Sequence, residues 1–106
     1  TFKCDDASTA IRLVSETNMS GSIVSASVTA VASVTDDTMM RLGWHYDGES
    51  SIKVFSDDVH VATLSVVSGT NLNTDEAMSP IFAVLTGEAA AQTAVIDYIA
   101  AAQEKP

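Results

Sequence analysis

The stretch SIVSASVTAVASVT, which begins at Ser22, constrains the fold more than any other part of the sequence. It places an apolar side chain at every second position, and most residues between these positions carry a hydroxyl group. The apolar residues of this series are Val24, Ala26, Val28, Ala30, Ala32 and Val34. A period of two with many β-branched side chains is typical of a strand that buries one face. The sequence therefore predicts a strand over 22–34.

This predicted strand is long, because strands in globular proteins usually have about 5–6 residues. A bend or a β-bulge is therefore expected within it. The alternative is a helix, which would place Ile23, Ser27, Ala30 and Val34 on one face.

Two shorter strands are predicted in the middle of the chain. Residues 51–55 and 59–67 are rich in apolar and β-branched side chains. The triplet Ser56-Asp57-Asp58 between them has the composition of a turn. We expect a hairpin here, and the alternative is a helix that is capped at Ser56 and ends at Gly69.

The N-terminal segment CDDASTAIRLVSETN, residues 4–18, has the spacing of a helix. Its apolar residues at that spacing are Ala7, Ala10, Ile11 and Val14. Asp5 or Asp6 can cap the helix, since acidic residues suit a helix N-terminus. A short helical turn is also predicted after Thr35, ending at Gly43.

Two more helices are predicted at the C-terminal end of the chain. Asn73 begins the first in a capping-box pattern, with Leu72 in the staple position, and Pro80 interrupts or restarts it. The second covers the alanine-rich residues 88–104, because Ala has the highest helix propensity. Its apolar stripe consists of Ala91, Val95, Tyr98, Ile99 and Ala102. That stripe would pack on the core or on another subunit.

These elements predict a single α+β domain over residues 1–106. In this fold an N-terminal helix precedes an antiparallel β-layer of residues 22–34, 51–55 and 59–67, and two C-terminal helices pack on the layer. A hydrophobic content of 46% favours a folded chain. The alternative fold is a mostly α-helical bundle, in which the 22–34 and 57–68 segments are helices.

The charge of the chain limits its partners. It has 14 acidic and 5 basic residues and a formal net charge of −9. Such a surface repels phosphate backbones and anionic lipid headgroups, so we expect no nucleic-acid partner. No apolar run approaches the ~18 residues that span a bilayer, so no membrane insertion is expected. A protein partner, or a second copy in a homo-oligomer, fits this sequence better.

The cysteine content and the polar composition bear on the location of the protein. Cys4 is the sole cysteine, which excludes an intramolecular disulfide and makes this residue a candidate for an intermolecular one. The chain has 13 Ser and 11 Thr beside three Lys, shows no signal peptide and begins at Thr1. We therefore expect an exported protein, periplasmic or extracellular, with a cytoplasmic location as the alternative.

The segment WHYDGES contains the candidate binding residues. They are Trp44, His45, Tyr46 and Asp47, together with His60 from the predicted neighbouring strand. On a strand, His45, Asp47 and Glu49 would share one face, as divalent-cation ligands can. Asp47-Gly48 is, however, a turn signal that would break this arrangement. We therefore expect a turn anchored by the two aromatic rings, with no metal site and no bound cofactor.

Catalytic motifs are absent from the sequence. It contains no nucleophile elbow, P-loop, dinucleotide-binding fingerprint or HExxH motif, and no catalytic residue is assigned. The sequence thus favours a non-enzymatic structural or interaction protein that self-assembles through an exposed strand or the C-terminal helix. The alternative is a small-ligand or metal-binding module, or a hydrolase, centred on residues 44–49 and His60.

Overall fold

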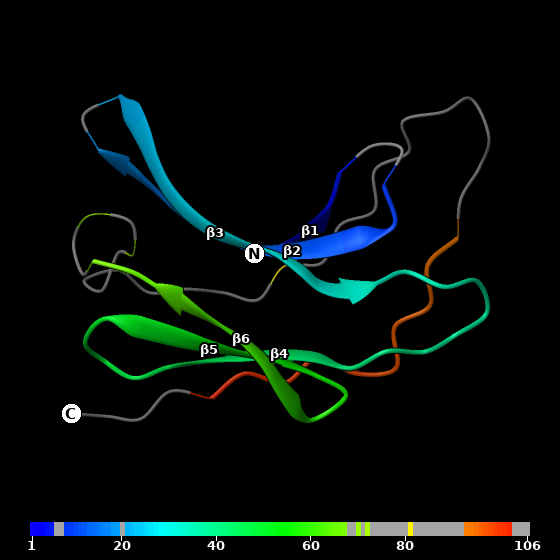
Figure 1. Cartoon of the computed structure of the whole chain (residues 1–106). Coiled ribbons are helices and arrows are strands. Elements are labelled where there is room, and N and C mark those ends of the chain that lie inside the picture. Colours follow the sequence, from blue (N-terminus) through cyan, green and yellow to red (C-terminus); the bar gives the residue numbers. More distant parts are fainter. Residues whose placement is uncertain are drawn as a thin grey trace. The chain divides into compact units, whose positions relative to one another are not determined.

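The computed structural model describes residues 1–5, 8–19, 21–67, 70, 72, 81 and 93–102. The chain divides into two compact units, Thr1–Asp75 and Glu76–Pro106. The first unit contains two antiparallel sheets of three strands each (Figure 1). Sheet A has the order β1-β2-β3, from strands Phe2–Cys4, Ala10–Met19 and Ser22–Ser33. Sheet B has the order β4-β5-β6, from strands Leu42–Tyr46, Ser51–Ser56 and Val59–Ser65.

The β2–β3 hairpin contains the interruption that the length of the strand predicts. Ile11 pairs with Ala32 but Leu13 pairs with Val28, so β3 advances by four residues while β2 advances by two. Ala30 lies in this bulge with φ of 56°, a left-handed conformation that alanine rarely adopts. The bulge shifts the alternation of buried and exposed faces along β3. As a result, Ala30 is exposed and Val31, the next residue, is buried. At the predicted inward positions, Val24, Ala26 and Val28 are half-buried, whereas Ala30 is exposed.

The β5–β6 hairpin is closed by a two-residue turn. Ser56 pairs with Val59, which leaves Asp57 and Asp58 as the connection, with φ of 50° and 66°. Positive φ at both positions is the requirement of a type I′ turn, whose twist matches that of paired strands. Arg41 reinforces the turn, since its N–H donates to Asp57 Oδ1 at 3.0 Å. The predicted hairpin is therefore confirmed.

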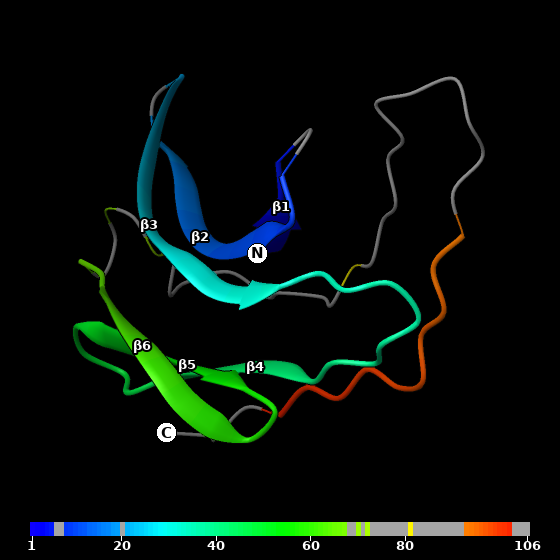
Figure 2. The same cartoon turned by 45° about the vertical axis from the view of Figure 1, so that its right-hand side comes forward.

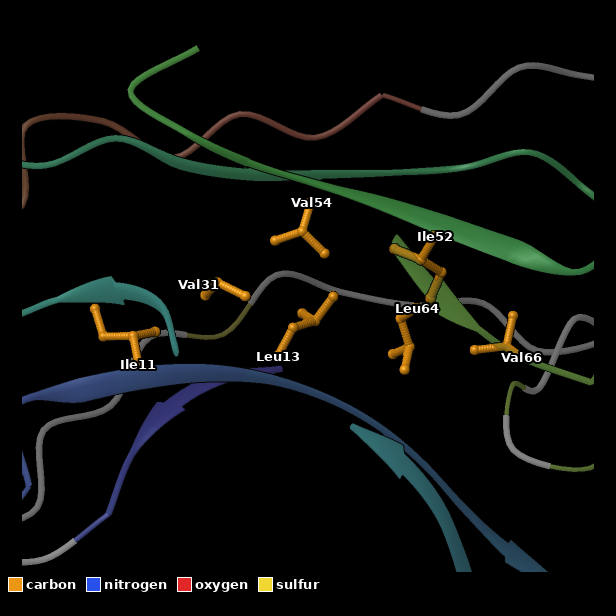
Figure 3. Packing of buried hydrophobic residues seen from close by; sticks show 7 residues of the cluster. All are labelled: Ile11, Leu13, Val31, Ile52, Val54, Leu64 and Val66. Carbon is orange, nitrogen blue, oxygen red and sulfur yellow. The ribbon is translucent and has the colours of Figure 1, made fainter. Parts of the chain in front are cut away.

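The core lies between the two sheets of the first unit. Sheet A contributes Ile11, Leu13 and Val31 to it, and sheet B and the residues just after it contribute Ile52, Val54, Leu64 and Val66. Figure 3 shows these side chains converging from both sides. Aliphatic side chains of this size each contribute about 1.5–3 kcal/mol when fully buried. Hydrophobic contact between the two sheets therefore holds the unit together.

The predicted α+β class is wrong, because the described residues form an all-β structure without helices. The mostly helical alternative is wrong for the same reason. Strands at 22–34, 51–55 and 59–67 do form, as β3, β5 and β6, but they belong to two sheets and not to one layer. The single-domain expectation over 1–106 stays a prediction.

The N-terminal helix predicted over 4–18 is replaced by β1, a connection and β2. Ile11 and Val14 fit a helical period, but Ile11 and Leu13 also fit a period of two and are both buried. β2 pairs with a strand on each side, so its backbone hydrogen bonds are made within sheet A. Tertiary pairing of this kind overrides a local helical preference.

The helical turn predicted after Thr35 is also wrong. The N–H of Thr38 donates to the Thr35 carbonyl at 3.3 Å, and Asp37 adopts φ of 53°. This is a tight turn that leads towards β4, in which Gly43 is an ordinary strand residue and not the end of a helix. Acidic residues favour turns as well as helix caps, which explains the error.

The C-terminal helices are tested only in part. The first, after Asn73, lies outside the described residues apart from Ile81. Within the second, the described residues 93–102 have no regular secondary structure, so the helix is wrong there. Val95 is 75% exposed and Ile99 is 54% exposed. A short helix in water is marginal without a packing surface, whatever its alanine content.

The core predicts a clear contrast between two substitutions. Leu13→Ala should lower the free energy of unfolding by about 2–5 kcal/mol, because it removes a buried side chain and leaves a cavity. Val59→Thr, at a position that is 62% exposed, should change it by less than about 0.5 kcal/mol. Urea unfolding followed by Trp44 fluorescence measures both. Equal losses in the two variants would contradict this assignment of the core.

Candidate functional site

The candidate residues of the WHYDGES segment lie on both faces of sheet B. Trp44 and Tyr46 pair with Val54 and Ile52, whose side chains are buried, so the two aromatic rings share the core-facing side. Trp44 is nevertheless 46% exposed, because β4 is an edge strand. His45 pairs with Lys53 and lies on the opposite, outer face. The alternation of β4 thus separates His45 from its aromatic neighbours.

Asp47 organises the turn that follows β4. Its Oδ1 accepts the N–H groups of Glu49, Ser50 and Ser51 at 2.8, 3.0 and 3.1 Å. Its Oδ2 accepts the Ser51 hydroxyl at 2.7 Å. Gly48 adopts φ of 86°, which a residue with a side chain rarely reaches. The predicted turn at Asp47-Gly48 is therefore present, and this carboxylate is its centre.

These hydrogen bonds hold the pKa of Asp47 well below its ordinary value of 3.8. The N–H of Glu49 has the largest effect, followed by the hydroxyl of Ser51. Hydrogen bonds to the charged form of a carboxyl group favour that form. Tyr46 closes the same turn, since its hydroxyl donates to the Glu49 carbonyl at 3.1 Å. Both carboxylate oxygens of Asp47 therefore accept hydrogen bonds from groups within the turn itself.

His60 is exposed on β6 and belongs to a different group of side chains. Its ring lies 5.7 Å from the ring of Phe55, with an angle of 51° between the planes. Its Nε2 lies 3.0 Å from Thr63 Oγ1. β5 separates β6 from β4, and His45 lies opposite Lys53 whereas His60 lies opposite Phe55. The two histidines are therefore more than two strand spacings apart, or more than ~10 Å. The structure therefore does not bring the two histidines together.

No group of three or more His, Cys, Asp or Glu side chains that could hold a metal ion occurs among the described residues. Cys4 lies on the edge strand β1, where its thiol is exposed and donates to the Ser8 carbonyl at 2.8 Å. An intermolecular disulfide through Cys4 stays a prediction.

The outer edge of β3 is a candidate binding surface that lies outside the predicted site residues. Figure 2 shows β3 at one border of sheet A. Val14 of β2 exchanges hydrogen bonds with Thr1, at 2.8 Å from its N–H and 2.6 Å to its carbonyl. Both groups of Val14 therefore point away from β3, and Val14 and its partner Ser27 form a non-hydrogen-bonded pair. The N–H and carbonyl of Ser27 consequently face outward.

The outward direction found for the backbone groups of Ser27 recurs at every second residue along β3. Residues two apart direct their backbone groups to the same side of a strand, so Ile23 and Ser25 face outward together with Ser27. We call the backbone groups of Ile23, Ser25 and Ser27 the β3 edge. Within the described part of the chain, no further strand pairs with it. The side chains of these residues are also exposed, and Ile23 is exposed to 72%.

The β3 edge differs from the other three borders of the two sheets. β1 is three residues long and includes Lys3, and β4 is five residues long and includes His45. β6 has a register shift opposite Val54 and Phe55. β3 is twelve residues long and contains no charged residue, proline or glycine. Natural sheets protect their edges with short strands, charges or bulges, and the only one of these in β3 is the bulge at Ala30.

Comparison with known proteins finds no matching family model, curated protein or solved structure. None of the described residues forms a helix long and apolar enough to cross a membrane. A function must therefore be inferred from the geometry of the described residues.

The Asp47 turn predicts a pH-dependent contribution to stability. Because the folded pKa is depressed, the charged carboxylate stabilises the fold above pH 3.8 and less so as the pH falls towards the folded pKa. Asp47→Asn should therefore lower the melting temperature at pH 7. The difference in melting temperature between this variant and the native chain should become smaller below pH 3.8. Melting curves at several pH values measure this. Asp36→Asn, which removes the same charge from another turn, should lower the melting temperature less, and a constant Asp47→Asn difference would contradict the prediction.

Proposed function

We propose that this chain is a non-enzymatic structural or interaction protein that binds its partner by strand addition at the β3 edge. In this binding mode an extended segment pairs with an exposed sheet edge, and main-chain hydrogen bonds supply the affinity. The observation that carries the proposal is a long, uncharged edge strand whose outward backbone groups pair with no described strand. Export from the cytoplasm is part of the proposal and rests on composition alone.

The chemistry of the β3 edge favours an extended, uncharged segment as its ligand. Ser25 and Ser27 place small hydroxyl side chains on the solvent face, so an added strand meets neither bulk nor charge there. Each backbone hydrogen bond contributes about 0.5–1.5 kcal/mol net, because water competes for the same groups. A few such bonds give modest affinity, which is suitable for assembly at high local concentration.

A direct test uses a peptide of alternating threonine and valine, acetylated at its N-terminus and amidated at its C-terminus. Fluorescence polarisation of a labelled peptide should show saturable binding to the native chain. The double variant Ser25→Pro/Ser27→Pro should lose at least tenfold in affinity, because proline removes the outward N–H groups that an added strand needs.

The matched control is Ser25→Thr/Ser27→Thr, which keeps both N–H groups and suits a strand. It should bind the peptide as the native chain does. Circular dichroism should show the same β-sheet content in both double variants, because outward N–H groups make no bonds within the sheet. Equal peptide binding by the proline and threonine variants would overturn the proposed function.

A further inference from the structure

We infer that the partner at the β3 edge is a second copy of this chain, paired antiparallel with β3 about a two-fold axis at Ser25. This inference rests on the proposed function and names the partner of the same surface. The two copies would join their A sheets into one continuous sheet of six strands. Such a contact is isologous, because the same residues of both copies form it.

The net charge of the chain restricts the surfaces through which two copies can meet. Each chain has a formal net charge of −9, so two copies repel each other in most orientations. The borders of sheet B carry or adjoin charged groups, such as Arg41 paired with Asp58 at the β5–β6 turn. Pairing of β3 with β3 about Ser25 brings residues 22–28 of the two copies together, and none of these residues is charged. This contact therefore places no side-chain charge of one β3 opposite a side-chain charge of the other.

The outward backbone groups decide the register. In the part of β3 that pairs in regular register with β2, residues 22–28, they lie at Ile23, Ser25 and Ser27. An antiparallel pairing uses all three positions of both copies only if Ser25 lies opposite Ser25 of the second copy. Ile23 then lies opposite Ser27, and the ladder is complete in both directions. A shift of two residues along the strand would leave one of the outward positions unpaired in each copy.

The side chains on the solvent face fit this register. Two serine hydroxyls meet at the axis, and cross-strand pairs of hydroxyl side chains stabilise antiparallel strands. Ile23, which is 72% exposed in the single chain, gains a neighbour in Ser27 of the second copy. The register thus places small polar groups at the centre of the contact and covers part of an exposed apolar side chain.

Disulfide trapping tests both the partner and the register. Cys4→Ser removes the native thiol, and Ser25→Cys or Ser27→Cys is added to that background. Paired residues in this geometry have Cα atoms about 5.5 Å apart, within the ~4.4–6.8 Å that a disulfide spans. Two residues at position 27 would instead be separated by four positions along the strand, or about 13 Å. On mild oxidation with glutathione, Ser25→Cys should give at least tenfold more covalent dimer than Ser27→Cys.

The possible results separate this inference from the proposed function. Addition of Ser27→Pro to the Ser25→Cys chain should abolish the covalent dimer, because the paired strand loses a donor. Equal dimer yields from Ser25→Cys and Ser27→Cys, or a higher yield from Ser27→Cys, would overturn the register. Without any Ser25→Cys dimer, continued binding of the threonine–valine peptide would mean that the edge accepts another protein's strand. Loss of peptide binding as well would overturn the proposed function itself.

Discussion

The pairing of β2 with β3 is the interaction on which the rest of the structure depends. β2 is the central strand of sheet A, so its backbone groups alternate between β1 and β3. It also carries Ile11 and Leu13, two of the buried residues that contact sheet B. The same pairing that builds the core therefore determines which backbone groups of β3 face outward. The β3 edge is a consequence of the register of β2, and not of any particular side chain.

An unprotected edge is a liability unless something uses it. A long strand without charges or proline is a template for pairing with other chains, and proteins normally avoid exposing one. In this chain the net charge of −9 opposes indiscriminate association, since copies repel each other wherever charged surfaces meet. Repulsion over most of the surface and attraction at one uncharged strand together favour a defined contact over aggregation. This balance is the physical basis of the proposed function.

Much of the sheet structure could be predicted from the sequence, whereas the predicted helices are wrong wherever the structure describes their residues. β3, β5 and β6 form near their predicted positions because alternation and β-branched side chains agree with their tertiary environment. The N-terminal prediction is wrong because Ile11 fits a helical period with Val14 and a strand period with Leu13. The choice between the two periods depends on pairing with β3, which is a separate strand. The bulge could be expected from the length of β3, but its position at Ala30 depends on the pairing with Ile11 and Leu13.

The candidate site could likewise be predicted from the sequence only in part. The turn at Asp47-Gly48 follows from local chemistry, because aspartate and glycine suit its conformation, and it forms as predicted. The location of His45 and His60 relative to each other depends on which strand lies between β4 and β6, and no local pattern contains this information. The β3 edge is backbone, so a search for reactive side chains does not find it. The uncharged composition of 22–33 is the sequence signal that indicates it.

Amide hydrogen exchange measured by NMR at increasing protein concentration tests the β3 edge most directly. In dilute solution, the amides of Ser25 and Ser27 should exchange at least tenfold faster than that of Ala26, whose N–H faces β2. Raising the concentration should slow exchange at Ser25 and Ser27 and leave Ala26 unchanged. Slow exchange at Ser25 and Ser27 at a concentration where the chain is a monomer would show that the edge is already paired within the single chain, which would contradict the account.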